Sequence, residues 1–228
     1  PRSTPKPSSA ASDVYKRQSL IKELIICNML ELDAWMEIAK LAAIEGGKYL
    51  LANQAKDQEV LLSEGRDIKL KLDTDTEHLI KKILKSKSSF SILGEETGSS
   101  GDLDNTYWVV DPLDGTSNFL RGIPISCVSI ALMQDMKPML GVIYDFNHDE
   151  IYWGHKESKA YIDDNEIRVS SLSQKSESTL VTGIPAKTNY SDSEFSEMIS
   201  NFQAWKKIRM IGSAAMAACY VCLLYTSP

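Results

Sequence analysis

The sequence contains few cysteines, few histidines and no long apolar run, the features by which disulfide-rich and membrane proteins are identified. Its 228 residues include only four cysteines and three histidines, and no apolar run approaches the roughly twenty residues needed to cross a bilayer. Cysteines this few and this irregularly spaced exclude a disulfide scaffold and favour a reducing compartment. Acidic residues outnumber basic ones, 31 to 25, which argues against a general nucleic-acid or anionic-membrane surface. We therefore expect a cytoplasmic protein that binds neither nucleic acid nor membrane.

Both ends of the chain carry a pattern that has no explanation at the level of the protein. The string GATGTGTATAAGAGACAG can encode residues 13–18, and its reverse complement, read one base further on, encodes residues 222–227. Such an inverted repeat resembles the transposon-end adapter of sequencing libraries, and segments of that kind are set aside before a fold is inferred. The chain is therefore interpreted as a non-native segment with a disordered, Pro- and Ser-rich start at 1–18, an uncertain leader at 19–32, a domain at 33–221 and a non-native tail at 222–228.

The same interpretation removes an apparent Cys-x-x-Cys motif. Cys219 and Cys222 have the spacing of a redox or zinc site, but Cys222 belongs to the tail. We expect a lone, buried Cys219 on an apolar helix. The histidines His78, His148 and His155 stand in polar contexts, and we expect all three at the surface.

Hydrophobic periodicity outlines the domain. Apolar residues at helical spacing predict a helix over about 32–63 with a break near Gly46-Gly47. The capping-box form of Thr74-x-x-Glu77 predicts a second helix from near Asp75. Further patterns predict strands at 67–72, 90–93, 107–110, 125–133, 139–144, 150–153, 160–162, 167–169, 179–183 and 207–210, and helices at 193–202 and 213–221. The closely spaced strands in the middle indicate an antiparallel meander, and the whole indicates a layered α/β or α+β domain.

The most informative segment follows the predicted strand at 107–110 and reads DPLDGTSNF from Asp111 onward. A buried strand would deliver Asp111 at its carboxyl end, and Pro112 would force a turn that brings Asp114 back towards it. Gly115 permits close backbone approach, so the N–H groups that follow can face an anion if a helical turn begins there. Two converging carboxylates beside a phosphate-sized nest are typical of a divalent-metal site for a phosphoester. The plainer interpretation is an Asp-Pro turn with a helix cap.

Other acidic residues are weaker signals by themselves. Gly94-Glu95-Glu96 ends another predicted strand, but such a loop is usually solvated surface. Asp73, Asp75 and Glu77 lie near a helix start, where acids favour the helix macrodipole with or without a function. An EF-hand interpretation of these three fails, because its sixth and twelfth positions would be His78 and Leu84.

Together these segments resemble the inositol monophosphatase family of metal-dependent, lithium-sensitive phosphatases. The string DPLDGTSNF, preceded by Gly94-Glu95-Glu96, carries the resemblance. Asp73 and Glu77 match the spacing of the family's first acidic block, and the sequence from Arg209, RMIGSAA, is similar to its later Arg-x-x-Gly-[Ser/Thr]-Ala-Ala element. The resemblance covers about residues 33–221. It implies a layered α-β-α-β-α sandwich of the inositol monophosphatase and fructose bisphosphatase type, with its C-terminal part incomplete, and a homodimer when full length.

The resemblance also implies a set of metal ligands. Glu95, Asp111 and the carbonyl of Leu113 would hold one Mg²⁺, and Asp111 and Asp114 would share a second. Asp73 would help to hold a third, weaker ion. Magnesium prefers carboxylate, water and phosphate oxygens, so this ligand set suits it.

The resemblance assigns catalysis and substrate binding to the same region. Asp73, Thr116 and Glu95 would form the catalytic group, with Thr116 and Asp73 orienting and deprotonating the attacking water. The N–H groups of Gly115 and Thr116 would cradle the phosphate. Residues lining the substrate would also include Asp114, Gly212, Ser213 and Ala214. The implied reaction is Mg²⁺-dependent hydrolysis of a small phosphomonoester, an inositol or sugar phosphate, by in-line displacement.

Two departures from the family pattern bear on this prediction. The residues before Asp73 read DIKLKL, where the family usually has a Val-Thr pair. A further metal-ligand aspartate of the family would fall after the last residue of this sequence. We therefore expect the full-length parent to be active and this chain to be weak or inactive.

Other functions stay open. The acid motif is shared by 3′-phosphoadenosine 5′-phosphate nucleotidases, fructose bisphosphatases and histidinol phosphatases, although Asn118-Phe119 favours the inositol type. A non-catalytic, metal-binding homologue is the alternative of a different class. An α/β domain with a coincidental motif is the third.

Sequencing the gene or transcript across both ends tests the interpretation of the termini. We predict that the natural reading frame continues past Val221 and supplies the missing aspartate. A frame that stops at Pro228 would contradict the adapter interpretation and place the non-catalytic alternative first.

Overall fold

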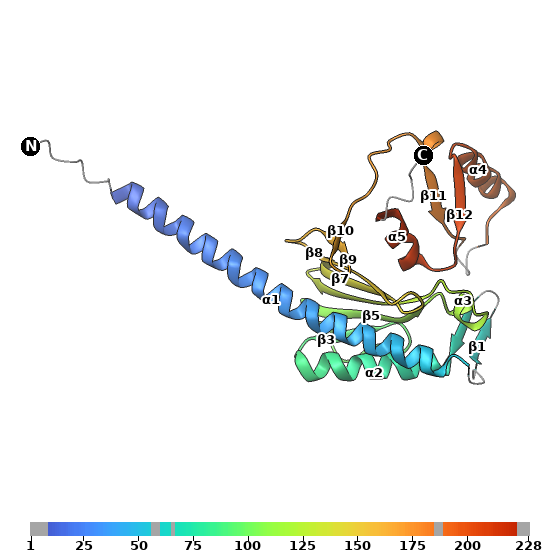
Figure 1. Cartoon of the computed structure of the whole chain (residues 1–228), viewed down its shortest axis with the longest axis horizontal. Helices are drawn as coiled ribbons and strands as arrows, with labels where there is room; N and C mark the ends of the chain where they lie inside the picture. The colour runs from blue at the N-terminus through green and yellow to red at the C-terminus, as the bar shows by residue number, and fades with distance from the viewer. Residues whose placement is uncertain (1–8, 56–59, 65–66, 185–188, 223–228) are drawn as a thin grey trace, which may run out of the picture.

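The computed structural model describes residues 9–55, 60–64, 67–184 and 189–222. At its centre is a mixed sheet of eight strands in the order β10-β9-β8-β7-β6-β5-β3-β4. Helices α1 (Ser9–Asn53) and α2 (Lys71–Lys87) cover one face of this sheet, and α5 (Ala214–Cys222) lies against the other (Figure 1). Beyond α5 lie a small parallel sheet of β11 (Thr179–Thr182) and β12 (Lys207–Met210), and then α4 (Asp192–Gln203). The layers alternate α-β-α-β-α, as the resemblance implied.

The predicted antiparallel meander is confirmed. Strands β5 to β10 pair each with the next in antiparallel register, while β3 pairs with β5 in parallel. The strands of this sheet are β3 (Ser91–Gly94), β4 (Gly98–Ser99), β5 (Thr106–Asp114), β6 (Cys127–Gln134), β7 (Lys137–Asp145), β8 (Glu150–His155), β9 (Ala160–Ile162) and β10 (Asn165–Ile167). The last of them lies earlier than the predicted strand at 167–169, because it pairs with β9 directly across the turn at Asp163.

The first predicted helix is longer at its start and shorter at its end than the sequence indicated. Helix α1 begins at Ser9, so residues 9–12 are helical where composition predicted disorder, and its N-terminal part extends away from the rest of the chain (Figure 1). The helix ends at Asn53, and β1 (Val60–Glu64) follows in antiparallel pairing with β2 (Asp67–Leu70). The prediction that the helix reaches residue 63 was therefore wrong.

The predicted break at Gly46-Gly47 was also wrong, because the helix is continuous there. The two glycines serve close packing instead. A Cβ atom on Gly47 would lie 2.6 Å from the ring of Tyr144 on β7, and one on Gly46 would lie 2.8 Å from Cδ1 of Ile80 on α2. The absence of side chains lets α1 approach both the sheet and its neighbouring helix.

Helix α2 begins at Lys71 rather than near Asp75. The backbone N–H of Leu70 donates to Oδ2 of Asp73 at 3.1 Å, so Asp73 stabilises the first turn. A buried stripe of Leu72, Ile80 and Leu84 then faces the core. The capping-box pattern at Thr74 pointed to the right helix but to the wrong first turn.

Two hydrophobic clusters lie on the two faces of the large sheet. The larger cluster joins α1, α2 and the sheet, and the indole of Trp108, fully buried, donates to the hydroxyl of Ser88 at 2.9 Å. The smaller cluster lies between the sheet and α5 and consists of Cys127, Tyr152, Met216 and Cys219. Cys219 is 4% exposed, which confirms the prediction of a buried cysteine on this helix.

One of the three histidines is not at the surface. His78 and His148 are exposed, as expected. The side chain of His155 is only 3% exposed, and its Nε2 lies 3.2 Å from Oδ1 of Asp33 on α1. The polar sequence context was misleading because α1, distant in the sequence, covers this end of β8. Within the described part of the chain, no helix is long and apolar enough to cross a membrane.

Gly47→Ala should lower the thermal midpoint of unfolding more than Gly46→Ala. The new methyl group at 47 meets the ring of Tyr144 and the Cβ of Phe146, which could move only if the sheet moved with them. At 46 the methyl group meets the end of a flexible isoleucine side chain, which can move more easily. Overpacking typically costs about 1–3 kcal/mol and the gain in helix propensity returns about 1 kcal/mol. Thermal unfolding followed by circular dichroism measures the difference. Equal midpoints for the two variants would contradict the packing argument.

Candidate active site

The end of β5 carries the two aspartates of the motif in an irregular register. Asp111 pairs with Ser129 on β6 and Asp114 pairs with Cys127, so the register shifts between them. The expected turn at Pro112 is thus a bulge inside a strand that continues to Asp114. Proline has no N–H for the ladder, and a bulge of this kind redirects the side chains that follow it.

Glu95 reaches the same edge of the sheet from β3. Its backbone N–H donates to the carbonyl of Val110 on β5 at 3.0 Å, which holds the loop after β3 against the strand that carries Asp111. Glu95 and Asp111 also share a side-chain hydrogen bond. The two acids of separate sequence blocks are therefore neighbours, and their role as metal ligands stays a prediction from the resemblance.

Burial and like charge together make Asp111 a weak acid. Burial is the main cause, and the charge of Glu95, the hydrogen bond with it and the charge of Asp114 add to the effect, which raises the pKa of Asp111 to about 9. The N–H of Leu113, which donates to Oδ1 of Asp111 at 3.1 Å, opposes the shift only in part. Carboxyl groups crowded in this way share protons or bind a cation.

Asp114 is turned towards the protein in this conformation. Its Oδ2 accepts hydrogen bonds from the hydroxyl of Ser213 at 2.6 Å and from the N–H of Ala215 at 2.7 Å. The described residues hold no group of three His, Cys, Asp or Glu side chains arranged to bind a metal ion. The Glu95–Asp111 pair fits a divalent cation by its chemistry, and the Asp114 carboxylate has lone pairs for an ion besides the two hydrogen bonds that it accepts.

The loop after Asp114 has the geometry of a close backbone approach. Gly115 adopts a positive φ of 92°, and a Cβ atom there would lie 2.8 Å from the carbonyl of Ile125. Helix α3 (Thr116–Leu120) begins at the next residue, which meets the condition for the following N–H groups to face an anion. The hydroxyl of Thr116 donates to the carbonyl of Leu113 at 3.1 Å. Thr116 is thus tied to a predicted ligand carbonyl, and its pairing with Asp73 stays a prediction.

Asp73 lies 2% exposed at the start of α2. Strand β2, which leads into α2, contacts α3, so Asp73 belongs to the same region as Thr116. The hydrogen bond that it accepts from the N–H of Leu70 stabilises the first turn of the helix. The described contacts leave its role in catalysis as a prediction.

Two asparagines organise this site through contacts that no local sequence pattern indicates. The side-chain amide of Asn118 donates to the carbonyls of Ile125 at 2.8 Å and Ile211 at 2.7 Å. That of Asn147, on the turn after β7, donates to the carbonyl of Ser126 at 3.0 Å. They hold the segment that lies beneath Gly115.

The last predicted site residues are brought to this edge by the link from β12 to α5. Gly212 has a positive φ of 75°, and a Cβ atom there would meet the Asn118 amide at 3.0 Å. Ser213 follows with its hydroxyl on Asp114. Ala214 is the first residue of α5. The structure therefore brings together Glu95, Asp111, Leu113, Asp114, Gly115, Thr116, Gly212, Ser213 and Ala214.

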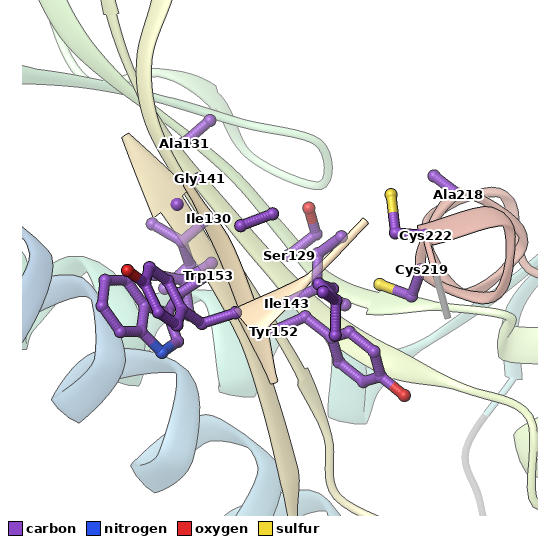
Figure 2. A pocket seen from close by; sticks show the side chains of 15 residues that line it. Ser129, Ile130, Ala131, Gly141, Ile143, Tyr152, Trp153, Ala218, Cys219 and Cys222 are labelled. Atoms are coloured by element: carbon purple, nitrogen blue, oxygen red, sulfur yellow. The ribbon is translucent and has the colours of Figure 1, made fainter. Parts of the chain in front are cut away.

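An apolar hollow of about 250 Å³ lies elsewhere, between α5 and strands β6 to β9 (Figure 2). Tyr152, Trp153 and Cys219 are among the side chains that line it, and no carboxylate does. Burial raises the pKa of Cys219 to about 12, so its thiol is protonated and unreactive at neutral pH. This hollow lacks the charges of a phosphate or metal site.

Comparison with known proteins identifies the family of the chain. The chain matches the model of the inositol monophosphatase family over residues 31–223. It belongs to that family. It is 32% identical over 197 residues to a fructose-1,6-bisphosphatase/inositol-1-monophosphatase of Aquifex aeolicus, with 85% of this chain and 75% of the relative covered. It is also 32% identical to an inositol-1-monophosphatase of Synechocystis, with 82% of this chain and 66% of that relative covered.

Solved structures show the same fold. The suhB protein of Bartonella henselae superposes with a TM-score of 0.75 at 30% identity, covering 83% of this chain and 75% of that one. An inositol monophosphatase of Anabaena superposes with a TM-score of 0.73 at 31% identity, covering 84% and 72%. This inositol monophosphatase family member therefore spans two thirds to three quarters of the length of its relatives.

Asp111→Asn should make the stability of the metal-free protein less dependent on pH. The pKa of Asp111 is about 9 in the folded protein, and its ordinary value is 3.8. The stability that its protonated form contributes to the folded state is therefore fully present below about pH 4 and is lost as the pH rises towards 9. The wild type should thus lose stability between pH 5 and 9, and the variant should lose less. Each kcal/mol removed corresponds to about 2–4 °C in thermal midpoint for a chain of this size.

Thermal unfolding in the presence of EDTA at a series of pH values measures this effect. Asp104→Asn, at an exposed position, is the matched control and should follow the wild type. Parallel pH curves for the wild type and Asp111→Asn would show that the acids are not crowded as described.

Proposed function

We propose that the whole protein is a Mg²⁺-dependent phosphatase that hydrolyses a small phosphomonoester, an inositol or sugar phosphate. The observation that carries this proposal is the hydrogen-bonded Glu95–Asp111 pair, with Asp114 nearby, beside the positive-φ loop at Gly115. Burial first, and then the facing carboxylates, raise the pKa of Asp111 to about 9, and a divalent cation would stabilise its ionised form. Membership of a phosphatase family supports the reaction class.

The donor set suits Mg²⁺. Glu95, Asp111 and the carbonyl of Leu113 would hold one ion, Asp111 and Asp114 a second, and Asp73 would help with a third. All are oxygen ligands, which Mg²⁺ prefers. When bound, such ions neutralise charge on the transferred phosphate and make water a better nucleophile.

The chain's own groups would orient the reactants. The N–H groups of Gly115 and Thr116 would donate to the phosphate, since a glycine in this conformation lets the ester approach the backbone. Thr116 and Asp73 would orient the attacking water and accept its proton. Gly212, Ser213 and Ala214 would face the alcohol. Their support is the Ser213–Asp114 hydrogen bond, which places the start of α5 at the acids.

The geometry does not separate the related substrates. One relative is named both fructose-1,6-bisphosphatase and inositol-1-monophosphatase, and the nucleotidase and histidinol phosphatase activities use the same acids in our interpretation. A non-catalytic homologue is the alternative of another class. Homodimer formation, lithium sensitivity and a cytoplasmic location are part of the same proposal.

Phosphate release tests the proposal on protein made from the complete reading frame. We expect turnover of inositol 1-phosphate or a sugar phosphate with Mg²⁺, none with EDTA, and inhibition by Li⁺. Asp111→Asn should reduce turnover at least about a hundredfold, because mutating even a residue that only supports a metal ligand reduces activity by up to that factor. Fructose 1,6-bisphosphate, 3′-phosphoadenosine 5′-phosphate and histidinol phosphate, assayed in parallel, distinguish the alternatives.

Asp104→Asn should keep wild-type turnover in the same assay, because this side chain is exposed and outside the site. Turnover that persists in EDTA would contradict the metal-dependent mechanism. No turnover of any of these esters by a folded, metal-binding protein would support the non-catalytic alternative.

A further inference from the structure

Glu77 is a charged side chain buried inside the protein. It lies on α2, its side chain is 0% exposed, and its Oε1 forms an ion pair with Nζ of Lys81 at 2.8 Å. Lys81, one helical turn further on, is itself only 10% exposed. Burial alone would raise the pKa of Glu77, but hydrogen bonds from Lys81, Thr97 and the Glu96 backbone outweigh it and hold the pKa below its usual range. Glu77 is therefore a buried carboxylate anion.

Both oxygens of this carboxylate hold the loop that follows β3. Oε2 accepts the backbone N–H of Glu96 at 2.7 Å, and Oε1 accepts the backbone N–H of Thr97 at 3.1 Å. The hydroxyl of Thr97 also donates to Oε1. Lys81 completes the arrangement by donating to the Thr97 hydroxyl at 2.6 Å and to the carbonyl of Gly98 at 2.9 Å. The buried ion pair thus binds a loop as well as its own helix.

This loop is the one that carries Glu95. On its amino side, a Cβ atom at Gly94 would overlap the carboxylate of Glu77, so the backbone lies directly on that group. The N–H of Glu95 itself donates to Val110 on β5 at 3.0 Å. Glu95 is held by β5 at its own N–H and by Glu77 at the next two N–H groups. Its side chain is left to extend towards Asp111.

We infer that Glu77 is a positioning residue, which fixes the backbone of Glu95 so that the Glu95 carboxylate meets Asp111. This inference rests on the proposed function for its consequence in metal binding. Stability is a poor explanation of the arrangement, since apolar side chains often replace buried ion pairs without loss. The specific requirement is for two acceptor oxygens facing two backbone N–H groups. An amide of the same shape offers only one acceptor.

Three variants separate positioning from stability. Lys81→Met leaves both backbone hydrogen bonds but strands a buried charge, which is costly. The double variant Glu77→Gln with Lys81→Met removes both charges but loses one acceptor for the loop. Thr97→Val removes only a side-chain hydroxyl and keeps both backbone bonds, so it is the matched control within the loop.

Hydrogen exchange of the amides of 94–99, thermal midpoint and calorimetric binding of Mg²⁺ and Mn²⁺ are measured for each variant of the protein made from the complete reading frame. Lys81→Met should have a lower thermal midpoint than the double variant. It should keep the exchange protection and the metal affinity of Thr97→Val and of the wild type. The double variant should recover the thermal midpoint that Lys81→Met loses. Its exchange protection and its metal affinity should each fall by about tenfold, because that is the effect of losing one hydrogen bond to a charged group.

Wild-type exchange protection in the folded double variant would overturn the inference. So would lost protection with unchanged metal affinity, because the loop would then be held without positioning a ligand. If the double variant does not fold, Gly94→Ala tests the contact from the loop side and should give the same two losses. If the wild type binds neither metal, the proposed function fails, and the exchange comparison alone decides whether Glu77 holds the loop.

Discussion

The crowding of carboxyl groups at the end of β5 is the constraint on which the rest of the site depends. Burial is the main cause that opposes the ionisation of Asp111, and the charges of Glu95 and Asp114 add to it. Like charges this close would separate if the chain were free to move. Hydrogen bonds hold them in place: the Glu95 N–H donates to the carbonyl of Val110, the Leu113 N–H donates to Asp111, and the Ser213 hydroxyl donates to Asp114. This rigid frame of hydrogen bonds makes the site a strong candidate for cation binding.

The sheet supplies that frame through its order. Strand β5 is flanked by β3 in parallel and by β6 in antiparallel register, so the end of β3 and the start of β6 meet at the end of β5. One delivers Glu95, and the other begins beside Asp114. Helix α2 adds Glu77 beneath the β3 loop, and the link from β12 to α5 adds Ser213 from the second, smaller sheet. The small sheet and α5 thereby contribute to the site as well as to the hydrophobic core.

Predictions from the sequence were correct where the local pattern and the close packing of an element agree. They were wrong where the two differ. The meander was predictable because each strand pairs with its neighbour across a short turn. Gly46-Gly47 was misread as a helix break because a glycine pair lowers helix propensity, whereas here it admits the ring of Tyr144. Pro112 was misread as a turn because its missing N–H also fits a bulge. His155 was misplaced at the surface because the residue that covers it, Asp33, lies on a distant helix.

The chemical groups of the site and their local spacing follow from the amino-acid sequence alone: the carboxylates of Asp111 and Asp114 across a proline, Gly115 before a short helix, and a Gly-Glu-Glu loop after a strand. Those features depend on a few consecutive residues, whose backbone preferences are local. Long-range packing, in contrast, joins Ile125 to Ile211 through Asn118, places Ser213 on Asp114, and holds the Glu95 loop on Glu77. These contacts join residues far apart in the chain, and strand order and layer packing, which no local preference encodes, set their distances.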